Sequence, residues 1–227
     1  MIVNHKYKFV FIHIGKTAGD AITHTLTPFC DNKDVIKENT SLHPNFHKHS
    51  KAKEIQQAFK DLKWDWKNYF KFAIMRNPYE ILHSDYYFHK FFGIKHYSNN
   101  PPPENTQQYD WHLKCYKAIN QSFEDYALEH YGHWDKSFTR IYCMNHDGIV
   151  NVNRIYQQKS LSQEFPQICK HINIPETPLI KGNTTIELID KPRPKLQQDY
   201  TKKLIDFVEK TFAEDIALFN YNFQDAI

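Results

Sequence analysis

Two short apolar runs, at residues 9–14 and 69–75, stand out along a largely polar chain. Both contain several aromatic side chains, and such runs are typical of strands buried on both faces in a parallel sheet. Each run ends in turn residues, and residues suited to a helix follow, over 20–26 and from 78 to about 91. The pattern therefore predicts a strand, turn and helix unit that occurs twice.

Cap residues and apolar spacing predict four further helices, over residues 50–62, 122–130, 162–171 and 197–212. Ser50 suits the N-cap of the first of these, and Ser122 begins a capping box for the second. Residues 139–144 and 152–157, joined through the turn residues 145–148, predict a β-hairpin. Strands and helices thus alternate through much of the chain, as in α/β proteins.

Residues 93–108 contain the run Asn99–Pro103 and predict no regular structure. The segment is long for a connection, which makes it a candidate lid or acceptor-binding loop insert. It is too short to separate two domains. Because 227 residues usually share a single core, we expect one domain over residues 1–227.

Composition narrows the class of protein. With 29 basic and 26 acidic residues, the net charge of +3 is too small and too evenly spread to indicate nucleic-acid binding. The four cysteines are widely spaced without a C-x-x-C pair, so we expect a reduced, cytoplasmic protein without a disulfide framework. No apolar run approaches the roughly 20 residues that cross a bilayer, so no membrane association is expected. The sequence carries no signal of oligomeric state.

Residues 15–19, Gly-Lys-Thr-Ala-Gly, follow the first predicted strand and precede a helix. Such a turn directs backbone N–H groups and the positive end of the helix dipole at one point, which suits a phosphate. Lys16 adds a positive charge and Thr17 a hydroxyl. A Walker motif would place glycine where Val10 stands, which weakens the assignment to common NTPases. The plain alternative is a tight turn with a solvated lysine.

The second unit carries Arg76 at the end of its strand and Ser84 eight residues later. If a helix begins at Pro78, Ser84 lies about two turns into it, where it can share an oxyanion with the arginine. Taken alone, this pair is more often a surface arginine and an ordinary helical serine.

Together, the two units resemble the nucleotide motifs of carbohydrate-type, family 2-like sulfotransferases. In that family the first motif reads approximately F-x-H-I-P-K-T-G/A-G and the second V-R-N-P-x-x-R-x-x-S-x-Y. The matching segments here are residues 13–19 and residues 70–78 with Ser84 and Tyr86, and residues 212–221 resemble the closing helix of the family. The resemblance covers most of the chain apart from residues 93–108.

The resemblance implies a donor cosubstrate, 3′-phosphoadenosine 5′-phosphosulfate, and no metal. The resemblance places the 5′-phosphosulfate of this donor on the turn that comprises Gly15, Lys16, Thr17, Ala18 and Gly19. It also places the 3′-phosphate on Arg76 and Ser84. Asn183 and Thr184 resemble a segment that closes over the nucleotide. The implied fold is a three-layer α/β sandwich around a central parallel sheet, like that of P-loop nucleotide kinases.

Sulfuryl transfer needs charge stabilisation on the leaving phosphate and usually a base for the acceptor proton. We assign the first role to Lys16. The resemblance points to His49 as the base, with His43, His47 or Glu54 as alternatives. The three histidines have no complementary cysteine or carboxylate motif, so a zinc site is not expected.

His13 also follows the family motif, but on a buried strand it is better explained as a structural histidine. Gly15 replaces the usual proline of the motif. Asp20 and Ala21 replace hydroxyl residues that commonly bind the 5′-phosphate, and an aspartate at that position would repel the donor unless it points away or contacts the acceptor.

The leading hypothesis is therefore a sulfotransferase that moves a sulfuryl group in line to a hydroxyl of a carbohydrate or small-molecule acceptor. A P-loop small-molecule kinase is one alternative, and a nucleotide-binding protein without turnover is another. The acceptor itself is not specified, although aromatic and polar residues near the insert can stack on a sugar or a flat metabolite: Tyr97, Tyr109, Trp111 and His112.

Overall fold

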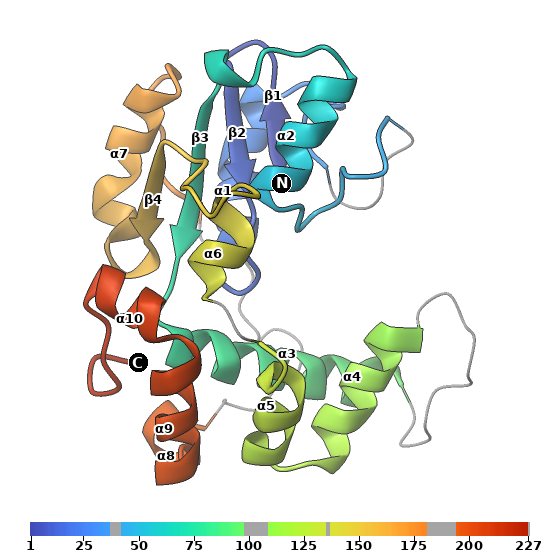
Figure 1. The fold of residues 1–227 in the computed structure, drawn as a ribbon, viewed down its shortest axis with the longest axis vertical. Coiled ribbons are helices and arrows are strands. Elements are labelled where there is room, and N and C mark those ends of the chain that lie inside the picture. The colour runs from blue at the N-terminus through green and yellow to red at the C-terminus, as the bar shows by residue number, and fades with distance from the viewer. Residues whose placement is uncertain (37–41, 98–108, 135–136, 181–193, 227) are drawn as a thin grey trace. The chain divides into compact units, whose positions relative to one another are not determined.

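The computed structural model describes residues 1–36, 42–97, 109–134, 137–180 and 194–226 (Figure 1). These residues form two compact units, one made of Met1–Arg76 and Phe138–Gly182 and the other of Asn77–Ser137 and Asn183–Ile227. The first unit contains the sheet, and the second is helical in its described part. The expectation of a single domain stays a prediction.

The sheet has four strands in the order β1 (Ile2–Asn4), β2 (Phe9–Ile12), β3 (Phe70–Met75) and β4 (Arg154–Gln157). Strands β2, β3 and β4 are parallel, with Phe11 opposite Phe72 and Ala73 opposite Ile155. All four residues of β2 are buried, as their apolar character predicts. The edge strand β1 is antiparallel to β2, so the sheet is mixed and not purely parallel. Its three residues are too few to show a strand pattern in the sequence.

Helices flank this sheet in the first unit. They are α1 (Gly19–Leu26), α2 (Ala52–Asp61), α6 (Phe138–Cys143) and α7 (Leu161–His171), with short 3-10 turns at Thr27–Phe29, Trp66–Asn68 and Gln158–Ser160. One core joins Ile22 of α1 and Phe165 of α7 to Phe11 and Phe72 on the sheet. The prediction of a mixed α/β protein with helices around a central sheet is confirmed.

The second unit consists of α3 (Pro78–His96), α4 (Tyr109–Asn120), α5 (Phe123–Tyr131), α8 (Leu196–Asp199), α9 (Lys202–Thr211) and α10 (Ala213–Phe219). Asn77 caps α3 by accepting a hydrogen bond from the Tyr79 N–H, and Ser122 caps α5 by accepting one from the Asp125 N–H. Aromatic side chains fill the interior: the Tyr86 ring packs against Phe123 at 5.3 Å between centroids.

Three local predictions were wrong. Residues 139–143 belong to the helix α6 and not to a strand, because the expected second arm forms β4 and pairs with β3 instead. Of the expected hairpin, an isolated antiparallel bridge joins Met144 to Val150. The N-cap of α2 is Lys51, since the Ser50 hydroxyl is used within the preceding loop. The helix expected over 197–212 is divided, because Thr201 caps a new helix by accepting from the Leu204 N–H.

Helix α3 extends beyond its expected end, to His96, and residues 98–108 of the proposed insert lie outside the described part. Within the described residues, no helix is both long and apolar enough to cross a membrane.

Candidate functional site

The turn at residues 15–19 connects β2 to α1 and contains two residues with left-handed backbones. Lys16 has φ of 63° and Ala18 has φ of 69°. Ala18 is the N-cap of α1 and supplies no side-chain cap. The first N–H groups of a helix have no acceptor inside that helix, and turns of this kind direct several such groups at one point. The backbone geometry of the turn, at the positive end of α1, therefore suits an anion.

Thr17 holds this turn together. Its hydroxyl donates a hydrogen bond to the Ile14 carbonyl at 2.8 Å, and its side chain is fully buried. The hydroxyl proton is therefore committed to the turn in this arrangement. Thr17 can still contribute its backbone and a hydroxyl lone pair to an anion.

Gly19 leaves no room for a side chain. A Cβ atom built there would lie 2.0 Å from Cδ2 and from Nε2 of His13. The His13 ring is 3% exposed, and burial lowers its pKa well below the ordinary value. In the described part of the chain, its buried Nδ1 has no hydrogen-bond partner, and a buried group of this kind is normally satisfied by water or a ligand. His13 therefore packs the end of β2 against α1 as a neutral ring.

His49 reaches the same turn from far along the chain. Its Nδ1 lies 2.9 Å from the His13 carbonyl oxygen, and a Cβ at Gly15 would lie 3.9 Å from its Cε1. Because a carbonyl only accepts hydrogen bonds, we assign the proton of the neutral ring to Nδ1, which leaves a lone pair on Nε2. Burial lowers the pKa of His49 to about 4, although the hydrogen bond to His13 opposes this shift. At neutral pH the ring is thus uncharged and able to accept a proton.

The alternative bases face helix α2. His43 lies 3.2 Å from the Asp61 carboxylate, and His47 lies 3.6 Å from the Glu54 carboxylate. Glu54 also accepts the Lys51 N–H at 2.8 Å and so closes the first turn of α2. His49 is the member of this group that the structure brings against the turn.

Arg76 joins the second predicted motif to the first. It follows β3, whose carboxyl end lies beside that of β2, and its guanidinium donates to the Lys16 carbonyl at 3.3 Å. The side chain is partly exposed. Ser84 lies on α3 in the other unit and is 5% exposed, so its pairing with Arg76 stays a prediction. Asn183 and Thr184 lie outside the described residues.

Asp20 and Ala21, which replace hydroxyl residues of the family motif, differ in exposure. Ala21 is 6% exposed and packs into the core. The Asp20 carboxylate is exposed and forms an ion pair with Lys48 at 2.8 Å. Lys48 was not predicted as a site residue from the sequence, although its position next to His49 was a usable signal.

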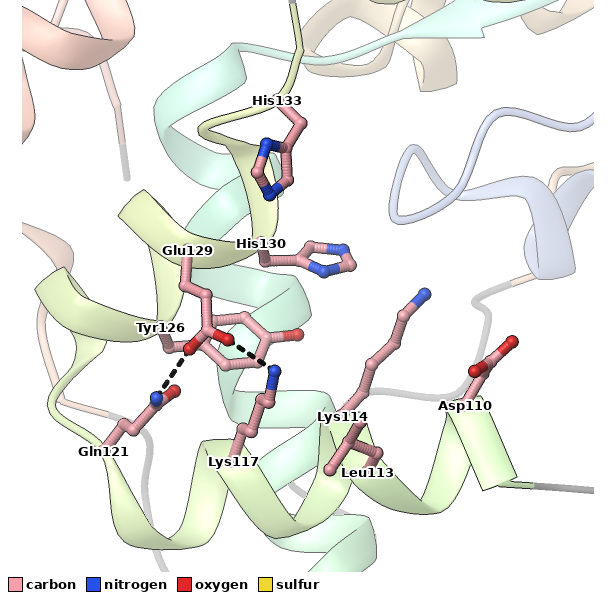
Figure 2. A pocket seen from close by; sticks show the side chains of 9 residues that line it. All are labelled: Asp110, Leu113, Lys114, Lys117, Gln121, Tyr126, Glu129, His130 and His133. Carbon is pink, nitrogen blue, oxygen red and sulfur yellow. Dashed lines mark hydrogen bonds and ion pairs between the residues drawn. The ribbon is translucent and has the colours of Figure 1, made fainter. Parts of the chain in front are cut away.

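A pocket of about 310 Å³ lies in the second unit (Figure 2) and was not foreseen. Its lining comes from α4, α5 and the residues next to them: Asp110, Leu113, Lys114, Lys117, Gln121, Tyr126, Glu129, His130 and His133. The expected acceptor residues are neighbours of this lining and not part of it. Trp111 packs against His89, with ring centroids 4.7 Å apart, and Tyr97 stacks on His112 at 3.7 Å.

Among the described residues, no group of three or more histidine, cysteine, aspartate or glutamate side chains is arranged to hold a metal ion. The four cysteines, Cys30, Cys115, Cys143 and Cys169, are free thiols.

Comparison with known proteins yields one family. A family model described as "Sulfotransferase family" matches residues 1–222, which is nearly the whole chain and includes both units. Searches of curated proteins and of solved structures each find no match.

Proposed function

The chain belongs to the sulfotransferase family, and from this premise we propose that it transfers a sulfuryl group from 3′-phosphoadenosine 5′-phosphosulfate to a hydroxyl of a carbohydrate or small-molecule acceptor. The observation that carries the proposal is the meeting of an anion-binding turn, an arginine and a neutral histidine at the carboxyl ends of β2 and β3. A fold like that of P-loop nucleotide kinases is part of the proposal, because a strand, phosphate turn and helix begin such folds.

The residues at the turn fit an anionic donor. Backbone N–H groups of residues 15–19 and the Lys16 ammonium suit the 5′-phosphosulfate, while Arg76 suits the 3′-phosphate. Ser84 is assigned to the 3′-phosphate as well, and Asn183 and Thr184 to closure over the nucleotide. The donor, when bound, supplies an activated sulfuryl group with a phosphate leaving group.

Lys16 is assigned to charge stabilisation. Its place in the turn, just before the N-terminus of α1, adds a full positive charge to the partial charge of the helix end. Charge that develops on the leaving phosphate is best stabilised by groups that are already oriented. The Arg76 contact with the Lys16 carbonyl supports such preorganisation, since it holds the backbone that carries the ammonium.

His49 is assigned as the general base. The ring orientation is set by the His13 carbonyl, so the lone pair of Nε2 is the group left for the acceptor hydroxyl. When Nε2 takes the proton, the same carbonyl stabilises the resulting imidazolium. A negatively charged donor beside the ring would raise its pKa from the low value of the free protein, which improves it as a base at neutral pH.

Acceptor binding is proposed for the pocket of the second unit. Figure 2 shows Lys114, His130 and Asp110 around one space, with the Tyr126 ring beside it. Glu129 is held in place by Lys117 and by Gln121, whose amide donates to it at 2.7 Å. The lining has two lysines and two carboxylates, so its positive and negative charges are balanced. This supports an acceptor that is recognised through its hydroxyls and one face of a ring, and not one that carries many negative charges.

The reduced compartment expected from the sequence is also part of the proposal, and the four free thiols agree with it. We expect the protein to act in the cytoplasm.

Calorimetric binding of adenosine 3′,5′-bisphosphate, adenosine 5′-phosphate and magnesium ATP tests the proposal. We expect the bisphosphate to bind most tightly, and Arg76→Ala to remove most of its advantage over the 5′-phosphate, because only the bisphosphate carries the 3′ group. Arg154→Ala, an exposed arginine on the neighbouring β4, is the matched control.

Preference for magnesium ATP would instead indicate the kinase. Binding of the bisphosphate without sulfuryl transfer to a broad panel of hydroxyl acceptors would indicate a nucleotide-binding protein.

A further inference from the structure

We propose that Lys48 is a positioning residue of the donor site, and that it acts by neutralising the Asp20 carboxylate at the start of α1. The inference rests on the proposed function, because it concerns the binding of an anionic donor to the turn at residues 15–19. It explains how this chain tolerates an acidic residue in a phosphate-binding motif.

Asp20 creates an electrostatic conflict at this position. It is the second residue of α1, where a carboxylate is favoured by the helix dipole and competes with a bound anion for the same positive end. Burial alone would raise its pKa, but the hydrogen bond and charge of Lys48, with smaller contributions from His24 and Lys16, lower the pKa overall. The carboxylate is therefore ionised at neutral pH and, if unpaired, would repel a phosphosulfate.

Lys48 provides the opposing charge. Its ammonium lies 2.8 Å from Asp20 Oδ1, and the two side chains are 39% and 55% exposed. An ion pair so exposed contributes little to folding stability. The ion pair has a larger effect on the affinity for a multiply charged ligand than on folding stability. It neutralises a negative charge at the site and holds the carboxylate toward Lys48.

The loop that carries Lys48 is held firmly at the turn. His49, the next residue, donates to the His13 carbonyl, so two consecutive residues contact the two flanks of the turn. Ser50 stabilises the same loop through hydrogen bonds within it. Its side chain is fully buried, and its hydroxyl donates to the Asn45 carbonyl at 2.6 Å and accepts a hydrogen bond from the His47 N–H at 2.8 Å. Lys48 thus meets Asp20 from a backbone that is already ordered.

The test is a double-mutant cycle with calorimetric binding of adenosine 3′,5′-bisphosphate. We expect Lys48→Met to weaken binding about three- to tenfold, as for the loss of one partly screened charge interaction with a multiply charged ligand. Asp20→Asn in the Lys48→Met background should restore most of the affinity, and Lys48→Arg should retain it. Raising the salt concentration should shrink the effect of Lys48→Met.

Lys203→Met is the matched control, because Lys203 also pairs with a carboxylate, Glu124 at 3.0 Å, but belongs to the other unit. It should leave binding unchanged. Circular dichroism and the thermal midpoint verify that each variant is folded.

Two results would overturn this inference but not the proposed function. In the first, the wild-type protein binds the bisphosphate and Lys48→Met binds it equally well. In the second, Lys48→Met weakens binding and Asp20→Asn does not restore it, which would mean that Lys48 contacts the donor directly. Absence of bisphosphate binding by the wild-type protein would overturn the proposed function, and this inference with it.

Discussion

At the scale of single residues, Lys16 and Lys63 share a left-handed backbone, with φ of 63° and 59°. Replacing either by alanine removes one positive charge and leaves a similar backbone strain. We predict that Lys16→Ala lowers kcat at least about a hundredfold, because a preorganised charge at the leaving group is lost. Lys63→Ala should leave kcat unchanged.

Steady-state sulfuryl transfer from the labelled donor measures both variants. Near-normal turnover by Lys16→Ala would show that the leaving group is stabilised by other residues.

His49 allows a separation of catalysis from binding. We predict that His49→Gln lowers kcat by about a hundredfold or more, whereas the affinity for the bisphosphate changes little, because the base acts on the acceptor and not on the nucleotide. His47→Gln is the matched control, since His47 faces Glu54 on α2. Equal losses in both variants, or none in either, would argue against the assignment.

At the scale of elements, the junction of β2 with α1 depends on two glycines that differ in their surroundings. A Cβ at Gly19 would lie 2.0 Å from the His13 ring, whereas a Cβ at Gly15 would make an ordinary contact, 3.9 Å from His49. We predict that Gly19→Ala lowers the free energy of unfolding by about 1–3 kcal/mol, as overpacking usually does.

Gly15→Ala should be close to neutral, because Gly15 does not have a positive φ. Urea unfolding of the two variants measures the difference. Equal stability of both would show that the His13 ring moves aside at little cost.

At the scale of the whole molecule, two partly buried histidines that are neutral in the folded protein make its stability depend on pH. Burial lowers the pKa of His49 in the first unit and of His130 in the second to about 4 in each case, from an ordinary value of 6.5. The unfolded chain therefore binds protons in this range that the folded chain does not. The stability from these groups is complete above pH 6.5 and declines as the pH falls toward 4.

We predict a loss on the order of 2–3 kcal/mol for each such histidine across this window. Denaturant unfolding at a series of pH values measures it, and His49→Gln should reduce the dependence that belongs to the first unit, while the contribution of His13, whose pKa is also lowered, remains. A curve for wild type that stays level between pH 6.5 and 4 would contradict the prediction.

The sequence alone was sufficient to predict the strands and the turn whose formation depends on neighbouring residues. The apolar runs at 9–14 and 69–75 predicted β2 and β3, and the Gly-Lys-Thr turn predicted the start of α1, because burial and chain reversal are properties of neighbouring residues. The family was also recognisable from these motifs, and the match over residues 1–222 confirms it.

Only the tertiary structure decided what distant segments do together. Residues 139–143 were expected to form a strand but belong to α6, because the segment at 154–157, their expected partner, pairs with β3 instead. His49 and Lys48 reach the turn through contacts to His13 and Asp20 that span 36 and 28 residues of chain. Such contacts depend on how the loop before α2 packs, and no local pattern encodes that packing.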